Sequence, residues 1–231
     1  MFKNFSVGRP RYLAVATCFL ILGVSATAYR TYVKHHTPGP FHPSNQGMCD
    51  YHNGMYFPTR ALLDGISPYG QEYADSNPVS RQIPFFSPGI LVLHTPLVLL
   101  PLAVGEVLFF TISVGLMIAI GLLLSSAEGG PKRLDFAIGM AALLVFSRGG
   151  HITLYDGYFT IELVLATFLA IYWGDRRPWL AALCLAVVSA KPTYILPLGF
   201  LLLVRGNVKA IVIGAVISIV AAVAPMLWLA W

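Results

Sequence analysis

The chain has 231 residues, of which 57% are hydrophobic and 11% are charged. Soluble domains carry about a quarter charged residues, so this composition excludes a soluble enzyme and indicates an integral membrane protein built mostly of helices. The net charge of +5 comes from short basic clusters between apolar runs, which argues against a nucleic-acid-binding stripe. The three cysteines show no CxxC spacing and predict neither a disulfide framework nor a zinc site.

The first apolar run covers residues 12–29 and follows three basic residues. The positive-inside rule therefore predicts a cytoplasmic segment over residues 1–11 and a first transmembrane helix over 12–29. A signal peptide has the same layout, and Ala26-Thr27-Ala28 resembles a cleavage site. In both cases the next segment lies outside.

Residues 30–102 are predicted to form a long extracytoplasmic loop that contains short helices. Within it, Met55 to Leu63 favours a helix that stops at Gly65, and Ser67-Pro68-Tyr69-Gly70 favours a turn. The apolar run Gly89 to Leu102 is too short to cross a hydrocarbon core of about 30 Å, so an interfacial or re-entrant helix is expected.

Residues 103–231 are predicted to form a membrane domain of several helices. The order of their crossings is chosen so that two basic pairs, Lys132-Arg133 and Arg176-Arg177, lie in the cytoplasm. Lys191-Pro192 breaks its apolar run into a hairpin of two short helices, and the last run ends without a polar flank, which indicates a fragment of a longer protein. The expected apolar elements are Ala103 to Leu124, Leu134 to Phe146, Phe159 to Trp173, Trp179 to Val204, and Val208 to Trp231.

Three ionisable residues fall inside apolar runs, where a charge costs about 2.5 to 3.5 kcal/mol at a helix centre. Glu106 and Glu162 lie near helix ends and are expected to reach toward water. Lys191 differs because the adjacent proline frees backbone carbonyls, a geometry typical of a water-filled or ligand-lined cavity.

Other polar residues have two interpretations each. Asp50 is either a helix cap or solvated loop acid, or a functional carboxylate. The segment Arg148 to His151 either ends a helix or binds phosphate through its guanidinium and backbone donors. Four histidines of the outer loop suggest a metal site, but their spacing matches no helical ligand pair, so no metal is expected. They are His35, His36, His42 and His52.

Several motifs follow one another along the chain. Asp50 is followed by Tyr56, Arg60-Ala61-Leu62-Leu63, Gly65, Ser67-Pro68-Tyr69, Pro84-Phe85-Phe86-Ser87-Pro88, Leu91 to Pro101, and Leu185 to Pro192. In order and spacing these motifs resemble glycosyltransferase family 87, a GT-C family that includes polyprenol-phosphate-mannose-dependent mannosyltransferases. The likeness runs from about Met48 to Lys209.

The chain departs from the family pattern at two places. Asp156-Gly157-Tyr158-Phe159 stands where the family usually shows a GQxN element, and Phe86-Ser87 stands in place of the tyrosine and first proline of its YPP motif. Family members are also longer, in keeping with an N-terminal fragment that lacks the helices completing the lipid groove.

The resemblance implies an all-α, multi-pass GT-C-like helical bundle in a bacterial plasma membrane. It further implies a glycosyltransferase of the cell envelope, which moves a sugar, with mannose as the first candidate, from a polyprenyl-phosphate donor to a glycolipid or polysaccharide acceptor on the periplasmic or extracellular side. Direct in-line attack would invert the anomeric centre, and the sequence shows no second carboxylate to support a covalent intermediate. Asp50 would be the general base. The phosphate contacts follow instead from the predicted topology, in which both outward turns face the same side, and would come from Lys191 with Arg148 or His151. Further substrate contacts would come from Tyr56, Arg60 and Tyr69. The lipid-linked sugar would be a substrate, and no cofactor is expected.

Two alternative functions, each from another class of membrane protein, remain. A transporter could use the broken helices and Lys191 to line a substrate path, but the chain shows no inverted repeat and such a protein does not need the long outer loop. A non-catalytic membrane fragment would also fit a chain that ends inside a helix.

Overall fold

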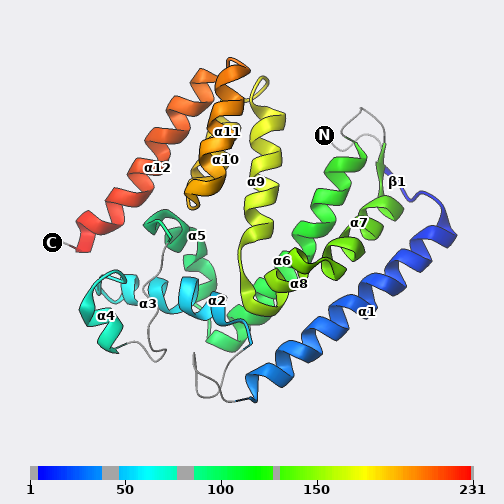
Figure 1. Ribbon diagram of the computed structural model, residues 1–231, viewed down its shortest axis with the longest axis horizontal. Helices are drawn as coiled ribbons and strands as arrows, with labels where there is room; N and C mark the ends of the chain where they lie inside the picture. Colours follow the sequence, from blue (N-terminus) through cyan, green and yellow to red (C-terminus); the bar gives the residue numbers. More distant parts are fainter. Residues whose placement is uncertain (1–4, 38–46, 77–85, 127–130, 230–231) are drawn as a thin grey trace. The chain divides into compact units, whose positions relative to one another are not determined.

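The computed structural model describes residues 5–37, 47–76, 86–126 and 131–229, and nearly all of these form helices (Figure 1). The chain divides into two compact units, each made of two separate segments. Unit 1 consists of Met1–Cys49 and Glu106–Ile161, and unit 2 of Asp50–Gly105 and Glu162–Trp231. The all-α membrane architecture expected from the sequence is confirmed.

Unit 1 is organised around helices α1 (Pro10–His35) and α7 (Leu134–Phe146), which pack side by side (Figure 1). Both start at the same end, because β1 (Phe5–Ser6) pairs in parallel with β2 (Lys132–Arg133) just before them. The Asp135 carboxylate accepts from the backbone N–H of Arg9 at 3.1 Å and also pairs with Arg133. This end of unit 1 thus gathers basic residues of two distant segments, as the positive-inside scheme requires.

Helix α1 is longer than expected, since it continues six residues past Tyr29 to His35. Hydropathy falls after Tyr29, but this part of the chain has no proline or glycine to stop a helix. Thr31 also stays inside, with its hydroxyl donating to the Thr27 carbonyl at 3.0 Å. Arg30 is therefore a helical residue rather than the first residue of a loop.

Helix α6 (Leu102–Ser125) approaches α7 closely at Gly121. A Cβ at Gly121 would lie 2.7 Å from both the Cα and the carbonyl oxygen of Ala137, which are backbone atoms that cannot rotate away. Gly115 on the same helix has no atom within 4 Å of such a Cβ. Small residues that let backbones approach are the usual contacts between membrane helices.

We expect Gly121→Ala to destabilise the protein by about 1 to 3 kcal/mol, because the added methyl must push α6 and α7 apart. Gly115→Ala is the matched control and should leave stability unchanged or raise it by up to about 1 kcal/mol, since alanine favours a helix more than glycine does. Thermal unfolding of the detergent-solubilised protein measures both. Equal melting temperatures for the two variants would contradict the close contact.

Helix α7 ends at a sharp break, where α8 (Arg148–Ile152) and the π-helical turn η2 (Thr153–Gly157) continue at 75° to it. With 13 residues α7 is about 20 Å long, too short to cross a core of about 30 Å without this continuation. By length and composition, the described residues contain three helices able to span a membrane, α1, α6 and α12 (Val208–Leu229), or four if the bent pair counts as one span.

The first part of unit 2 carries the short helices expected in the outer loop. They are α2 (Cys49–Tyr51), the π-helical turn η1 (His52–Tyr56), α3 (Phe57–Leu63), α4 (Gln71–Ser76) and α5 (Pro88–Val98). The helix predicted from Met55 begins earlier, at Cys49, and ends as predicted before Gly65, whose φ is +81°. The predicted turn is also present, with the Gly70 N–H donating to the Ser67 carbonyl.

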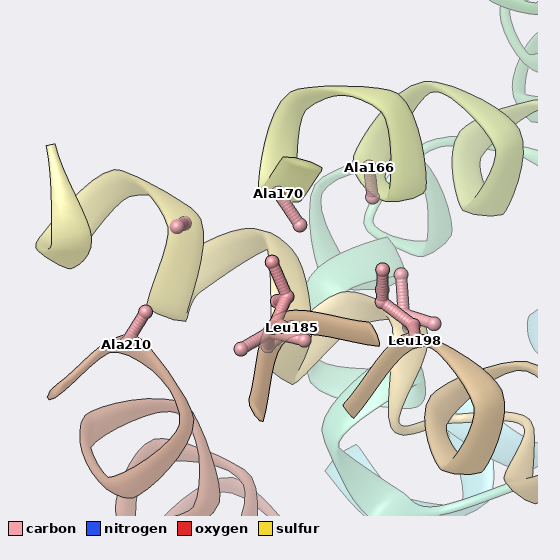
Figure 2. Packing of buried hydrophobic residues seen from close by; sticks show 8 residues of the cluster. Ala166, Ala170, Leu185, Leu198 and Ala210 are labelled. Carbon is pink, nitrogen blue, oxygen red and sulfur yellow. The ribbon is translucent and has the colours of Figure 1, made fainter. Parts of the chain in front are cut away.

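The second part of unit 2 is a stack of apolar helices: α9 (Thr160–Trp173), α10 (Pro178–Val188), α11 (Pro192–Val204) and α12. Its core combines alanines with a few larger residues, so that the helices pack closely. Figure 2 shows Ala166 and Ala170 of α9 near Leu185 of α10 and Leu198 of α11. The break predicted at Lys191-Pro192 lies between α10 and α11.

Asp175 joins the two turns at the other end of this stack. Its carboxylate accepts from the Asn207 side-chain amide at 2.6 Å and pairs with the Arg205 guanidinium. These two donors hold the pKa of Asp175 below its ordinary value. The basic residues around both turns, Arg176, Arg177, Arg205 and Lys209, therefore lie at the end of the stack opposite Lys191.

Candidate functional site

The predicted site residues fall into both units. Asp50, Tyr56, Arg60, Tyr69 and Lys191 belong to unit 2, whereas Arg148 and His151 belong to unit 1.

Asp50 lies in α2, the first turn of a helical segment that becomes π-helical at His52. The residues that follow it are almost fully buried: Tyr51 is 0% exposed, and His52 and Asn53 are 1% exposed. Asp50 itself is half-buried. A π-helical turn is rare and occurs frequently at functional sites, and this one begins two residues after Asp50.

Gly54 and Tyr69 bring the predicted loop motifs together in unit 2. A Cβ at Gly54 would lie 2.9 Å from the Phe86 ring, so only glycine leaves room for Phe86 there. The Tyr69 hydroxyl donates to the Phe86 carbonyl at 2.6 Å. Burial raises the pKa of Tyr69, which keeps it a hydrogen-bond donor.

Tyr56 and Arg60 also have partners within unit 2. The Tyr56 hydroxyl donates to the Leu100 carbonyl at 2.9 Å, which fastens η1 to the end of α5. The exposed Arg60 guanidinium pairs with Asp64 at 3.3 Å, one helical turn later. Together with Tyr69, these residues have a direct role in shaping the loop, and their contact with a substrate stays a prediction.

A buried pair links α5 to α9. His94, whose side chain is 4% exposed, lies with Nε2 3.2 Å from Oε1 of Glu162, and its Nδ1 lies 2.8 Å from the Ile90 carbonyl. A carbonyl only accepts, so Nδ1 carries a proton, and Nε2 shares a second proton with Glu162. The expectation that Glu162 reaches toward water is wrong. Glu106 likewise faces a partner in unit 1, since His35 lies 3.6 Å away.

Lys191 occupies the turn between α10 and α11 and is half-buried. Its Nζ lies 5.7 Å from the centre of the Tyr194 ring, a cation–π distance. The structure therefore places a cation where two short apolar helices meet, in the broken-helix setting that the sequence predicted.

In unit 1, Arg148 and His151 come together with a residue that the sequence did not single out. Arg30 of α1 lies with Nη1 3.1 Å from His151 Nε2, and Thr27 Oγ1 lies 3.2 Å from His151 Nδ1. Arg148 lines the same pocket, of about 390 Å³. Arg148 begins a helix capped by the Ser147 hydroxyl, so the alternative of a helix-ending turn is wrong.

Tyr155 and Asp156 also lie close to His151. The Tyr155 ring stacks on His151 at 5.6 Å, and the guanidinium of Arg30 and the ammonium of Lys34 lie 5.5 and 5.8 Å from its centre. The Met48 N–H donates to the Tyr155 carbonyl, and the Cys49 thiol lies 3.9 Å from Asp156. The chain segment that leads into Asp50 is thus anchored on η2.

No group of three or more His, Cys, Asp or Glu side chains that could hold a metal ion occurs among the described residues. His42 lies outside these residues.

A family model described as glycosyltransferase family 87 matches residues 85–231, which is more than half of the chain. The match includes Arg148, His151 and Lys191 and begins after Asp50, Tyr56, Arg60 and Tyr69. No curated protein and no solved structure matches the chain.

Proposed function

The chain belongs to glycosyltransferase family 87. From this membership we propose that it transfers a sugar, with mannose as the first candidate, from a polyprenyl-phosphate donor to an acceptor hydroxyl. The family makes the protein a membrane glycosyltransferase, which sets aside the transporter reading. The acceptor would be a glycolipid or a polysaccharide end. The observation that carries the proposal is the family match over a chain with three helices able to span a membrane.

The distribution of charge supports the proposed side of the membrane. Within unit 1, Arg9 and Arg133 lie at the end where α1 and α7 begin, while Arg148 follows the end of α7. Basic residues favour the cytoplasm, which supports an active site on the extracytoplasmic side. In a bacterium this would be the periplasmic or extracellular face of the plasma membrane.

In the proposed reaction Asp50 accepts the proton of the acceptor hydroxyl. The acceptor oxygen then bonds to the anomeric carbon of the sugar while the bond from that carbon to the phosphate oxygen breaks. The electron pair leaves with the lipid phosphate, which departs as an anion. Attack from the side opposite the phosphate inverts the anomeric centre.

Cations would stabilise the negative charge that develops on the departing phosphate. Lys191 of unit 2 is one proposed cation and Arg148 of unit 1 is the other, and His151 is proposed as an uncharged contact beside Arg148. The sugar passes through an oxocarbenium-like state, which Asp50 would also favour electrostatically. No cofactor takes part in this scheme, because the sugar arrives already activated by its phosphate.

The direct test uses membranes that contain the full-length gene product. We expect sugar transfer from polyprenyl-phosphate-mannose and none from a nucleotide-linked mannose, because the nucleotide donor lacks a lipid chain. Measurement of radiolabelled mannose in the lipid and polysaccharide fractions decides the matter. Transfer from the nucleotide donor alone would refute the proposed donor class.

We expect Lys191→Met to lower the rate of transfer by about 10- to 100-fold, because a hydrogen bond to a charged group is worth about 1.5 to 3 kcal/mol. Methionine keeps much of the length and apolar character of the side chain. Lys209→Met, in the first turn of α12 at the other end of the stack, is the matched control and should leave the rate unchanged. Equal rates for Lys191→Met and the unaltered protein would remove Lys191 from the site.

A further inference from the structure

The pocket of unit 1 between α1 and the α7–α8 break has two kinds of wall. One wall is polar and carries Thr27, Arg30, Arg148 and His151, and the other is formed by Gly23, Ala26, Val145 and Phe146. Its volume is about 390 Å³. Gly23 keeps this pocket open beside Phe146, since a Cβ there would lie 3.0 Å from the Phe146 ring.

The polar wall carries two guanidinium groups, and the nearby Asp156 carboxylate interacts with His151 and Lys34. Among the described residues, neither Arg30 nor Arg148 forms an ion pair with an acidic side chain. A guanidinium only donates, so His151 Nε2 accepts from Arg30 and the proton of this neutral imidazole lies on Nδ1, facing Thr27. Thr27 and His151 therefore position Arg30 and leave its charge available.

The position of Arg30 along α1 indicates where this charge lies in the membrane. Arg30 follows Pro10 by 20 residues, which is about 30 Å at 1.5 Å per residue. That distance equals the thickness of a hydrocarbon core, so Arg30 reaches the boundary at the far side from the N-terminus. Phosphate groups of lipids lie at this depth.

We propose that this pocket binds the phosphate headgroup of a lipid, with Arg30 as its main ligand. Arg148 supplies the second guanidinium, and paired guanidinium groups suit the oxygens of a phosphate. The first part of the hydrocarbon chain lies along Val145 and Phe146. The inference rests on the proposed function, in which the lipid is the polyprenyl-phosphate donor, and it adds Arg30 and Thr27 to the site.

The experiment measures binding of radiolabelled polyprenyl phosphate to the full chain in nanodiscs of neutral phosphatidylcholine. Arg30→Gln should weaken binding by about tenfold or more, the loss expected for one charge-assisted contact. Arg11→Gln, on the same helix near its other end, is the matched control and should bind as the unaltered protein does. Polyprenol, which lacks the phosphate, should bind weakly and equally to all three. Unchanged affinity in Arg30→Gln would overturn the proposal.

Competing ligands identify the source of the phosphate. Displacement by polyprenyl phosphate but not by phosphatidylglycerol assigns the pocket to the donor lipid, and equal displacement assigns it to anionic membrane lipids in general. Displacement by inorganic phosphate at the same concentration would show that the hydrocarbon chain of the lipid does not contribute to binding, and would overturn the proposal of a lipid ligand. If polyprenyl phosphate binding depends on Arg30 but the protein transfers no sugar, the proposed function alone is refuted. If the protein transfers sugar but Arg30→Gln binds polyprenyl phosphate as the unaltered protein does, this inference alone is refuted.

Discussion

Asp50→Asn should lower the rate of sugar transfer by about 10²- to 10⁴-fold, the usual contribution of a general base. Asparagine keeps the shape of the side chain and its ability to accept a hydrogen bond, but it cannot take the proton of the acceptor hydroxyl. Asp50 lies in the first turn of a buried segment and is itself half-buried, so the substitution should leave the protein in the membrane at its normal level.

The measurement compares transfer rates at equal amounts of membrane protein. Asp75→Asn is the matched control, because Asp75 is an exposed acid of the same outer loop, where it accepts a hydrogen bond from the Gln71 side chain in α4. It should keep the full rate. Full activity in Asp50→Asn would exclude Asp50 as the base.

His94→Leu should destabilise the protein by about 3 to 5 kcal/mol, because it leaves Glu162 without its buried partner. The side chains of this pair are 4% and 17% exposed, so water compensates little. The double variant His94→Leu with Glu162→Leu should recover most of the loss, since no buried charge remains. Thermal unfolding in detergent measures each variant.

Asp64→Asn provides the comparison with an exposed pair. Arg60 and Asp64 are about half exposed, and such pairs contribute about 0 to 1 kcal/mol. If His94→Leu loses no more stability than Asp64→Asn does, the contact between His94 and Glu162 does not stabilise the protein. A double variant as unstable as His94→Leu would show that the loss comes from packing and not from the unpaired charge.

Local signals predicted the elements of the fold well. Gly65 ends its helix because a positive φ suits glycine, and Pro192 begins α11 because a proline tolerates the first turn of a helix. These features depend on neighbouring residues only. The resemblance to glycosyltransferase family 87 is likewise confirmed over residues 85–231.

Pairings between distant residues could not be predicted in the same way. Glu162 looked like a helix-end acid, and its partner His94 comes 68 residues earlier. Arg30 looked like a loop residue because hydropathy falls at Tyr29, and its approach to His151 depends on how α1 packs beside α7. A single sequence carries no record of such contacts.

The contact between Arg30 and His151 has a consequence for the order of biosynthesis. Helix α1 leaves the ribosome before α8, because Arg30 and His151 are 121 residues apart. At about 5 to 20 residues per second, α1 waits roughly 6 to 24 s before α8 is made. During that interval Arg30 lacks its partner His151, and α1 lacks α7, on which it packs. Assembly of unit 1 is therefore completed only after α8 is made, and a factor that shelters a membrane helix carrying an unpartnered arginine would act on α1 in this window.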